Sequence, residues 1–110
     1  MGSGDTDSRR KNARIALDEL VSFTTFAGTN SLGQGEDVSL GGMRFKAVGC
    51  SLVYDELLRV SFNVRGQTIE AVGRVVWMTK LDDITSEVAL EFVRIDPWAV
   101  RLLEEALGSG

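Results

Sequence analysis

Apolar and polar residues alternate strictly near the middle of the chain, and this pattern limits the folds that are open to it. Residues 58–65 carry apolar side chains at every second position, with polar or charged residues between them: Leu58, Arg59, Val60, Ser61, Phe62, Asn63, Val64 and Arg65. A period of two places the apolar side chains on one face of a β-strand, which then packs against a core. Residues 65–67 supply a hairpin turn, so we expect an antiparallel neighbour.

Other segments have the composition or alternation of strands, at residues 14–26, 43–47, 69–77 and 88–92. The last two should direct these residues inward: Ile69, Ala71, Gly73, Val75, Trp77, Val88, Leu90 and Phe92. Residues 28–36 contain three glycines with Thr, Asn and Ser, which predicts a loop. Four large side chains are expected in core packing or helix docking, namely Met43, Tyr54, Trp77 and Trp98.

One helix is predicted at the C-terminal end of the chain. Asp96 can cap its free amides, Pro97 suits the first helical position, and Gly108 ends it. Apolar residues recur there with helical spacing, at Ala99, Leu102, Leu103, Ala106 and Leu107. Five or six short strands followed by one helix predict a mainly β fold, a small six-stranded antiparallel split β-barrel with the helix against its surface or mouth.

The length of 110 residues fits one domain, which we expect to span residues 8–107. Residues 1–7 are expected to form a flexible tail, and residues 1–4 and 108–110 look like additions to the natural chain. No apolar run reaches the length of a membrane span, and residues 1–7 lack the basic start and apolar stretch of a signal peptide.

The composition also excludes several classes of function. The chain has no histidine, which removes the Ser-His-Asp and Cys-His catalytic arrangements and the commonest metal ligand. Cys50 is the only cysteine, so an intrachain disulfide cannot form and a cytoplasmic location is the simplest setting. A net charge of −4 argues against binding to a nucleic acid polymer. We therefore expect a binding protein that is not an enzyme and needs no cofactor.

A cluster of cations precedes the first predicted strand. Residues 8–14 are Ser-Arg-Arg-Lys-Asn-Ala-Arg, so Arg10 and Arg14 stand four residues apart with Arg9 and Lys11 beside them. Residues 5–13, which we call the N-terminal arm, are polar and should be mobile when no ligand holds them. The cluster is equally consistent with ordinary solvated charge near a chain end.

A second motif, Glu-Asp-Val-Ser-Leu-Gly-Gly, occupies residues 36–42 between the predicted loop and the strand that follows it. Asp37 offers two acceptors and Ser39 a donor and an acceptor, while Gly41 and Gly42 allow positive φ and a close approach of a ligand to the backbone. An ordinary turn in which Asp and Ser bond their own backbone is the alternative interpretation.

Together the two motifs resemble those of the PilZ domain family, which has RxxxR ahead of the first barrel strand and (D/N)xSxxG between later strands. Arg10 and Arg14 match the first pattern, and Asp37, Ser39 and Gly42 match the second.

The later part of the chain is also similar to the family. Residues 73–77 look like its glycine-to-tryptophan strand, residues 88–92 look like its penultimate strand motif, and a C-terminal helix follows. The resemblance covers roughly residues 8–107, and the chain departs from the family pattern in the glycine-rich stretch at residues 28–35.

The resemblance implies binding of the bacterial second messenger cyclic di-GMP (c-di-GMP), a ligand with two phosphates and two guanines. The site residues that it implies are Arg9, Arg10, Arg14, Asp37, Ser39, Gly41 and Gly42. A guanidinium pairs bidentately with a phosphate or with O6 and N7 of guanine. Asp37 and the Ser39 hydroxyl would accept from guanine N1–H and N2–H, and the two glycines would keep the wall of the site low.

Ligand binding is then expected to pull the N-terminal arm onto the barrel and to pass the signal to a downstream protein partner. Two other classes of function remain open. One is a non-enzymatic adaptor with a PilZ-like barrel that binds only partner proteins. The other is a small barrel that binds single-stranded nucleic acid, which the acidic balance of the chain disfavours.

Overall fold

The computed structural model describes residues 13–108, in seven strands and one helix. The strands are β1 (Ile15–Ala16), β2 (Leu20–Thr25), β3 (Asn30–Val38), β4 (Gly42–Val48), β5 (Leu57–Val64), β6 (Gln67–Lys80) and β7 (Thr85–Ile95), and the helix is α2 (Pro97–Gly108). Within this part of the chain, no helix has the length and apolar character needed to cross a membrane.

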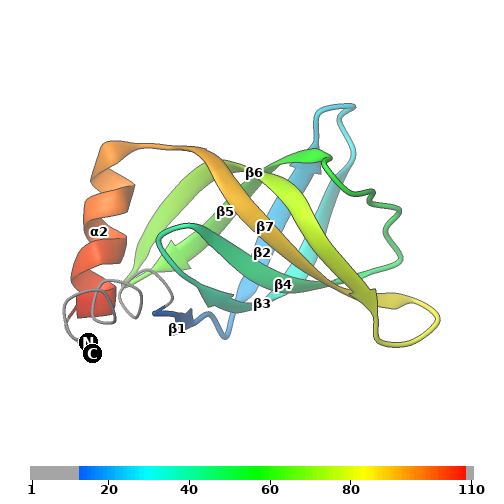
Figure 1. Ribbon diagram of the computed structural model, residues 1–110, viewed down its shortest axis with the longest axis horizontal. Helices are drawn as coiled ribbons and strands as arrows, with labels where there is room; N and C mark the ends of the chain where they lie inside the picture. Colours follow the sequence, from blue (N-terminus) through cyan, green and yellow to red (C-terminus); the bar gives the residue numbers. More distant parts are fainter. Residues whose placement is uncertain (1–12, 109–110) are drawn as a thin grey trace, which may run out of the picture.

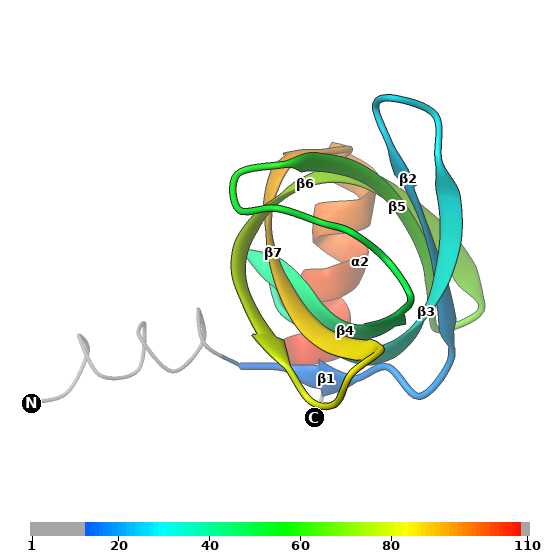
Figure 2. The same cartoon turned by 90° about the vertical axis from the view of Figure 1, so that its right-hand side faces the viewer.

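Six of the strands close into an antiparallel barrel. They pair in the order β3-β2-β5-β6-β7-β4, and a further pairing of β3 with β4 completes the ring. The two-residue strand β1 pairs with β3 outside this ring. Helix α2 covers one end of the barrel, as Figures 1 and 2 show from two directions. The predicted six-stranded antiparallel barrel with a C-terminal helix is confirmed.

The core fills the barrel and continues under the helix. Strand β5 alternates between buried and more exposed positions along its length, as its sequence predicts. The largest fully buried side chains come from six strands and the helix, and they are Phe23, Phe45, Met43, Leu58, Ile69, Leu103, Val21, Val38, Val75 and Val88. From α2, Ala99, Leu102, Leu103 and Ala106 are buried, so the predicted apolar stripe closes the mouth of the barrel.

The prediction of a loop at residues 28–36 is wrong, because most of this segment belongs to strand β3. Its glycines serve close strand packing: a Cβ on Gly33 would lie 2.7 Å from the carbonyl oxygen of Lys46, and one on Gly35 would lie 3.0 Å from that of Glu19. Gly28, with φ of 103°, is the only one of the three in a turn that needs positive φ. Glycine content therefore marks crowding here and not an irregular loop.

The single strand predicted at residues 14–26 is also wrong, since β1 and β2 are separate strands joined by residues 17–19. Leu17 in this connection is buried, and its amide donates to the carbonyl of Glu36 at 2.9 Å. The chain bends there because β1 pairs with β3 at Asp37 while β2 pairs with β3 farther along, from Gln34.

Three of the four large side chains assigned to packing are partly exposed. The exposed fractions are 57% for Tyr54, 42% for Trp77 and 40% for Trp98, whereas Met43 is buried as predicted. The cause at Trp77 is a register shift in β6: Val75 lies opposite Leu90, and Trp77 lies opposite Ala89. The extra residue of this bulge turns the tryptophan from the inner face to the outer face.

Candidate functional site

Asp37 binds two arginines from different parts of the chain. It lies on β3 next to a register shift, and its cross-strand neighbours are Ala16 on β1 and Arg44 on β4. Arg14, one residue before β1, donates from Nη1 to Oδ1 at 2.9 Å. Arg44 donates from Nε to both carboxylate oxygens at 3.1 Å and from Nη2 to Oδ2. The carboxylate thus positions two guanidinium groups side by side on the outer face of the barrel.

The two arginines favour the charged form of the Asp37 carboxyl. Burial would raise the pKa of this carboxyl, but the hydrogen bonds and charges of Arg44 and Arg14 outweigh burial and lower the pKa below its usual value. The hydrogen bond to Asp37 raises the pKa of Arg44 in turn. Two cations against one anion leave a local charge of about +1, which favours an anionic ligand.

Ser39 lies in the turn between β3 and β4, with only 5% of its surface exposed. Its amide donates to the carbonyl of Gly42 at 2.8 Å, and its hydroxyl also donates to that carbonyl, at 3.3 Å. The hydroxyl accepts from the amide of Gly41 at 3.3 Å. The serine therefore fastens the turn to its own backbone, whereas Asp37 does not, so the ordinary-turn interpretation holds for one residue of the motif and fails for the other.

The two glycines of the motif have different surroundings, and neither takes the positive φ that glycine allows. A Cβ on Gly42 would lie 1.9 Å from the carbonyl oxygen of Leu90, so this position has no room for a side chain. A Cβ on Gly41 would meet nothing within 4 Å, and the Gly41 carbonyl accepts from the amide of Phe92 at 2.8 Å. Packing of β4 against β7 explains Gly42, and open space above the turn surrounds Gly41.

Arg44 and Trp77 are site residues that the sequence analysis missed. The register of the sheet places Asp37, Arg44, Ala89 and Trp77 in one row across β3, β4, β7 and β6. Because neighbouring strands lie about 4.8 Å apart, the backbone positions of Trp77 and Arg44 are roughly 10 Å apart on the same outer face. Arg44 was within reach of sequence reasoning, because it alternates with buried Met43 and Phe45, but its pairing with Asp37 needed β3 to be recognised as a strand.

A second group of charges borders this row. Nζ of Lys46 lies 3.7 Å from Oε2 of Glu36, while Oε1 of Glu36 is buried without a hydrogen-bond partner among the described residues. The pKa of Glu36 is raised, first by a hydrogen bond with Glu87, which needs a proton on one of the two carboxyls, and then by burial and by the charge of Glu87. The cations Lys46 and Arg44 oppose this rise. Glu36 therefore takes up a proton at a higher pH than an isolated glutamate does.

The structure brings together Arg14 and Asp37 and places Ser39, Gly41 and Gly42 in the turn that follows. Arg9 and Arg10 lie outside the described residues 13–108, as does most of the N-terminal arm. One motif thus meets the other through the second arginine of RxxxR and the acid of DxSxxG, across 23 residues of sequence.

A family profile described as "PilZ domain" matches residues 8–109. The chain belongs to the PilZ domain family. PilZ domains are non-catalytic, and they commonly bind c-di-GMP. In this PilZ domain, the arginine motif and the Asp-Ser-Gly motif meet where Arg14 donates to Asp37.

Solved structures share the fold at low sequence identity. The PilZ domain of YcgR from Escherichia coli, determined with c-di-GMP, is 15% identical with a TM-score of 0.69, over 87% of this chain and 86% of that one. The inhibitor of motility MotI/DgrA from Bacillus subtilis is 16% identical with a TM-score of 0.70, over 88% and 48% of the two chains. The MrkH–c-di-GMP complex from K. pneumonia is 17% identical with a TM-score of 0.67, over 87% and 48%.

The present chain spans about half the length of MotI/DgrA and of MrkH. At these identities the likeness shows the PilZ fold. Comparison with curated protein sequences gives no match.

Proposed function

We propose that this PilZ domain is a receptor for c-di-GMP and that it binds the nucleotide on the outer face of the barrel around Asp37. The observation that carries the proposal is the pairing of Asp37 with Arg14 and Arg44, which presents two guanidinium forks to solvent beside the exposed face of Trp77. Arg9 and Arg10, in the arm that precedes Arg14, supply further cations when the arm closes over the ligand.

Each group has a chemical task in this proposal. Arg14 and Arg10 pair with the phosphates of c-di-GMP or with O6 and N7 of a guanine. Arg44 already occupies both oxygens of Asp37, so Arg14 can leave the carboxylate and the N1–H and N2–H donors of a guanine can take its place. The indole of Trp77 offers a surface on which a guanine can stack.

The turn supports this arrangement without touching the phosphates. Ser39 holds its shape, and the open space above Gly41 lets the ligand approach the backbone. Micromolar affinity needs about 8 kcal/mol, which three or four charge-assisted hydrogen bonds of about 1.5–3 kcal/mol each and guanine stacking of about 1–3 kcal/mol supply after the cost of ordering the arm.

Calorimetric titration of c-di-GMP into matched variants tests the assignment. Arg10→Ala and Arg14→Ala should each weaken binding by at least about tenfold, which corresponds to the loss of one charge-assisted hydrogen bond. Arg101→Ala, which removes the same charge from an exposed position on α2, should leave the affinity unchanged. Circular dichroism checks that each variant is folded. Near wild-type affinity in both motif variants would refute the assignment.

The role of Trp77 has its own measurement. The chain has two tryptophans, so Trp98→Phe leaves Trp77 as the only indole and its fluorescence reports on the site alone. Saturable quenching by c-di-GMP is expected, with the midpoint that calorimetry gives. An unchanged spectrum at saturation would rule out stacking on Trp77 while leaving the arginine assignment to the calorimetric result.

We also propose that closure of the arm passes the signal to a protein partner in the cytoplasm, a setting that suits the free thiol of Cys50. The alternative is an adaptor that binds partners without nucleotide. Thermal unfolding separates the two. A receptor at about one hundred times its dissociation constant gains about 2.7 kcal/mol from its ligand and melts at a higher temperature, whereas the adaptor shows no shift.

A further inference from the structure

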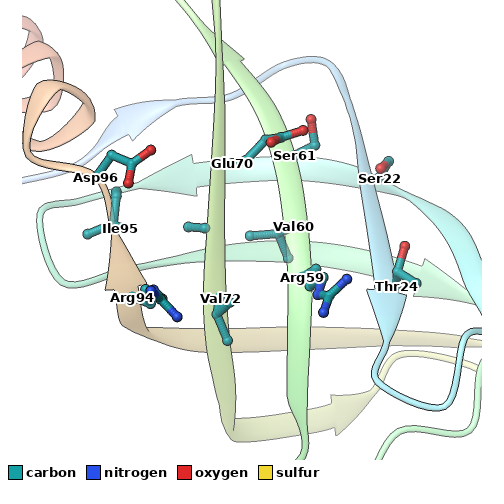
Figure 3. Close-up of a pocket in the computed structure, with 11 residues that line it drawn as sticks. Ser22, Thr24, Arg59, Val60, Ser61, Glu70, Val72, Arg94, Ile95 and Asp96 are labelled. Carbon is teal, nitrogen blue, oxygen red and sulfur yellow. The ribbon is translucent and has the colours of Figure 1, made fainter.

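A cavity lies in a part of the barrel wall that does not include Asp37. Its volume is about 410 Å³, within the usual range for small ligand sites, and its walls come from β2, β5, β6, β7 and the residue before α2. Figure 3 shows two outer rows of lining side chains that run across the strands, with Val60 and Ile95 between them. We call the space between the rows the channel.

One row is basic. It consists of successive cross-strand partners on the neighbouring strands β2, β5, β6 and β7, namely Thr24, Arg59, Val72 and Arg94. Their side chains therefore share one face. The guanidinium of Arg59 lies 4.7 Å from the centre of the Phe26 ring, which braces it. Arg94 stands two strands away, roughly 10 Å from Arg59 at the backbone, with half-buried Val72 between them.

The other row is acidic and hydroxylic. It contains three successive cross-strand partners, Ser22, Ser61 and Glu70. Asp96 extends this row beside Glu70, because the preceding residue Ile95 pairs with Ala71, the residue after Glu70. Each member lies two residues along its strand from a member of the basic row, which separates the rows by about 7 Å.

The charges of the two rows face the same space without pairing with each other. Among residues 13–108, neither Arg59 nor Arg94 takes part in an ion pair, and neither does Glu70 or Asp96. Their hydrogen-bonding capacity is therefore open to an occupant. An extended peptide that lies between the rows points its successive side chains to opposite sides of its backbone, so alternate residues face the basic row and the acidic row.

We propose that the channel binds an extended segment of a partner protein in which acidic and basic residues alternate. Acidic side chains on one edge of the segment pair with Arg59 and Arg94, while basic side chains on the other edge pair with Glu70 and Asp96. Charge complementarity of this kind selects the order of charges in the partner and not only their sum. Ser22 and Ser61 add neutral hydrogen bonds along the acidic row.

The channel is separate from the nucleotide site proposed above. On β6, Val72 of the basic row and Trp77 of the site are five residues apart, or about 17 Å along the strand. Partner binding in the channel therefore does not require displacement of c-di-GMP, and loss of one activity leaves the other measurable.

Two synthetic peptides of identical composition test the proposal on the isotopically labelled chain by nuclear magnetic resonance. One is acetyl-Glu-Lys-Glu-Lys-Glu-Lys-amide, and its isomer is acetyl-Glu-Glu-Glu-Lys-Lys-Lys-amide. The alternating peptide should shift the Nε–H signals of Arg59 and Arg94 with a dissociation constant of about 1 mM, as expected for a few exposed ion pairs, and the blocked isomer should bind at least about fivefold more weakly.

Variants localise the effect. Arg94→Glu should weaken the alternating peptide by about tenfold, since one attraction becomes a repulsion. Arg101→Glu makes the same change of charge on the outer face of α2, away from the channel, and should alter binding by less than about twofold. Arg59→Ala provides a second channel variant should Arg94→Glu disturb the fold.

Equal binding of the two peptides, or equal loss in Arg94→Glu and Arg101→Glu, would overturn the proposal in favour of general electrostatic attraction. Concentration-dependent dimerisation that Arg94→Glu abolishes would overturn it in favour of a second copy of the chain. Loss of c-di-GMP binding in Arg94→Glu would show that the channel belongs to the nucleotide site. A chain that fails to bind c-di-GMP but still distinguishes the two peptides refutes only the receptor function.

Discussion

Replacement of Gly42 by alanine should destabilise the barrel far more than replacement of its neighbour Gly41. At Gly42 the added Cβ would lie 1.9 Å from the carbonyl oxygen of Leu90, about 1 Å closer than such contacts allow. The obstacle is backbone, which cannot rotate away as a side chain would. Strands β4 and β7 must therefore separate where Gly42 pairs with Glu91.

The magnitude follows from what this separation disrupts. The hydrogen bonds from the Phe92 amide to the Gly41 carbonyl and from the Ser39 amide to the Gly42 carbonyl lie at the same point. Loss of two hydrogen bonds at about 1 kcal/mol each, with local overpacking of about 1–3 kcal/mol, predicts a total loss of unfolding free energy of about 3–5 kcal/mol. For a domain of this size, the melting temperature should fall by about 12–40 °C.

Thermal and urea unfolding, followed by circular dichroism, measure the effect. Gly41→Ala is the matched control, because its Cβ meets nothing within 4 Å and its cost should stay below about 0.5 kcal/mol. The comparison also separates packing from ligand contact, since only Gly41 borders open space. Equal stability of the two variants would refute the argument that packing of β4 on β7 dictates glycine at position 42.

Two further predictions concern pH. Burial would raise the pKa of Asp37, but the hydrogen bonds and charges of Arg44 and Arg14 outweigh burial and lower this pKa. The Asp37 carboxylate therefore stabilises the fold at pH values above its ordinary pKa. This stabilisation is lost as pH falls through the lowered pKa. Asp37→Asn should thus lower the free energy of unfolding by about 1–2 kcal/mol near neutral pH and by less below about pH 3. A difference between variant and wild type that stays constant with pH in urea unfolding would contradict this. A hydrogen bond with Glu87 raises the pKa of Glu36, so stability is lost as pH rises through the raised value. Glu36→Gln should raise the free energy of unfolding by about 0.5–1 kcal/mol near neutral pH and by almost nothing near pH 4. A loss of stability at neutral pH would mean that the ion pair of Glu36 with Lys46 outweighs the repulsion between Glu36 and Glu87.

Local patterns were sufficient for the class of fold and for part of the site. The alternation in residues 58–64 and the capped apolar stripe in residues 97–108 correspond closely to β5 and α2. The two motifs indicated Arg14 and Asp37, which the structure brings together. These features depend on neighbours within a few residues, so their physical cause is present in the sequence itself.

The errors arose where long-range pairing overrides local composition. Residues 28–36 have the composition of a loop, yet the barrel closes through the strand that most of them form. The reason is that only glycine at positions 33 and 35 lets the neighbouring segments of the backbone approach so closely. The outward direction of Trp77 depends on a bulge in β6, which a strict period of two cannot reveal.

Local sequence patterns were enough to predict strands with alternating apolar residues, one helix at the end of the chain, and cations and a DxSxxG turn in the first half of the barrel. Three features required the three-dimensional structure: Arg44 shares the carboxylate of Asp37, Trp77 lies on the same outer face, and four charges that form no ion pair within residues 13–108 line a separate channel. Each of these depends on the register between strands distant in sequence. A shift of register by one residue would send every such side chain to the opposite face.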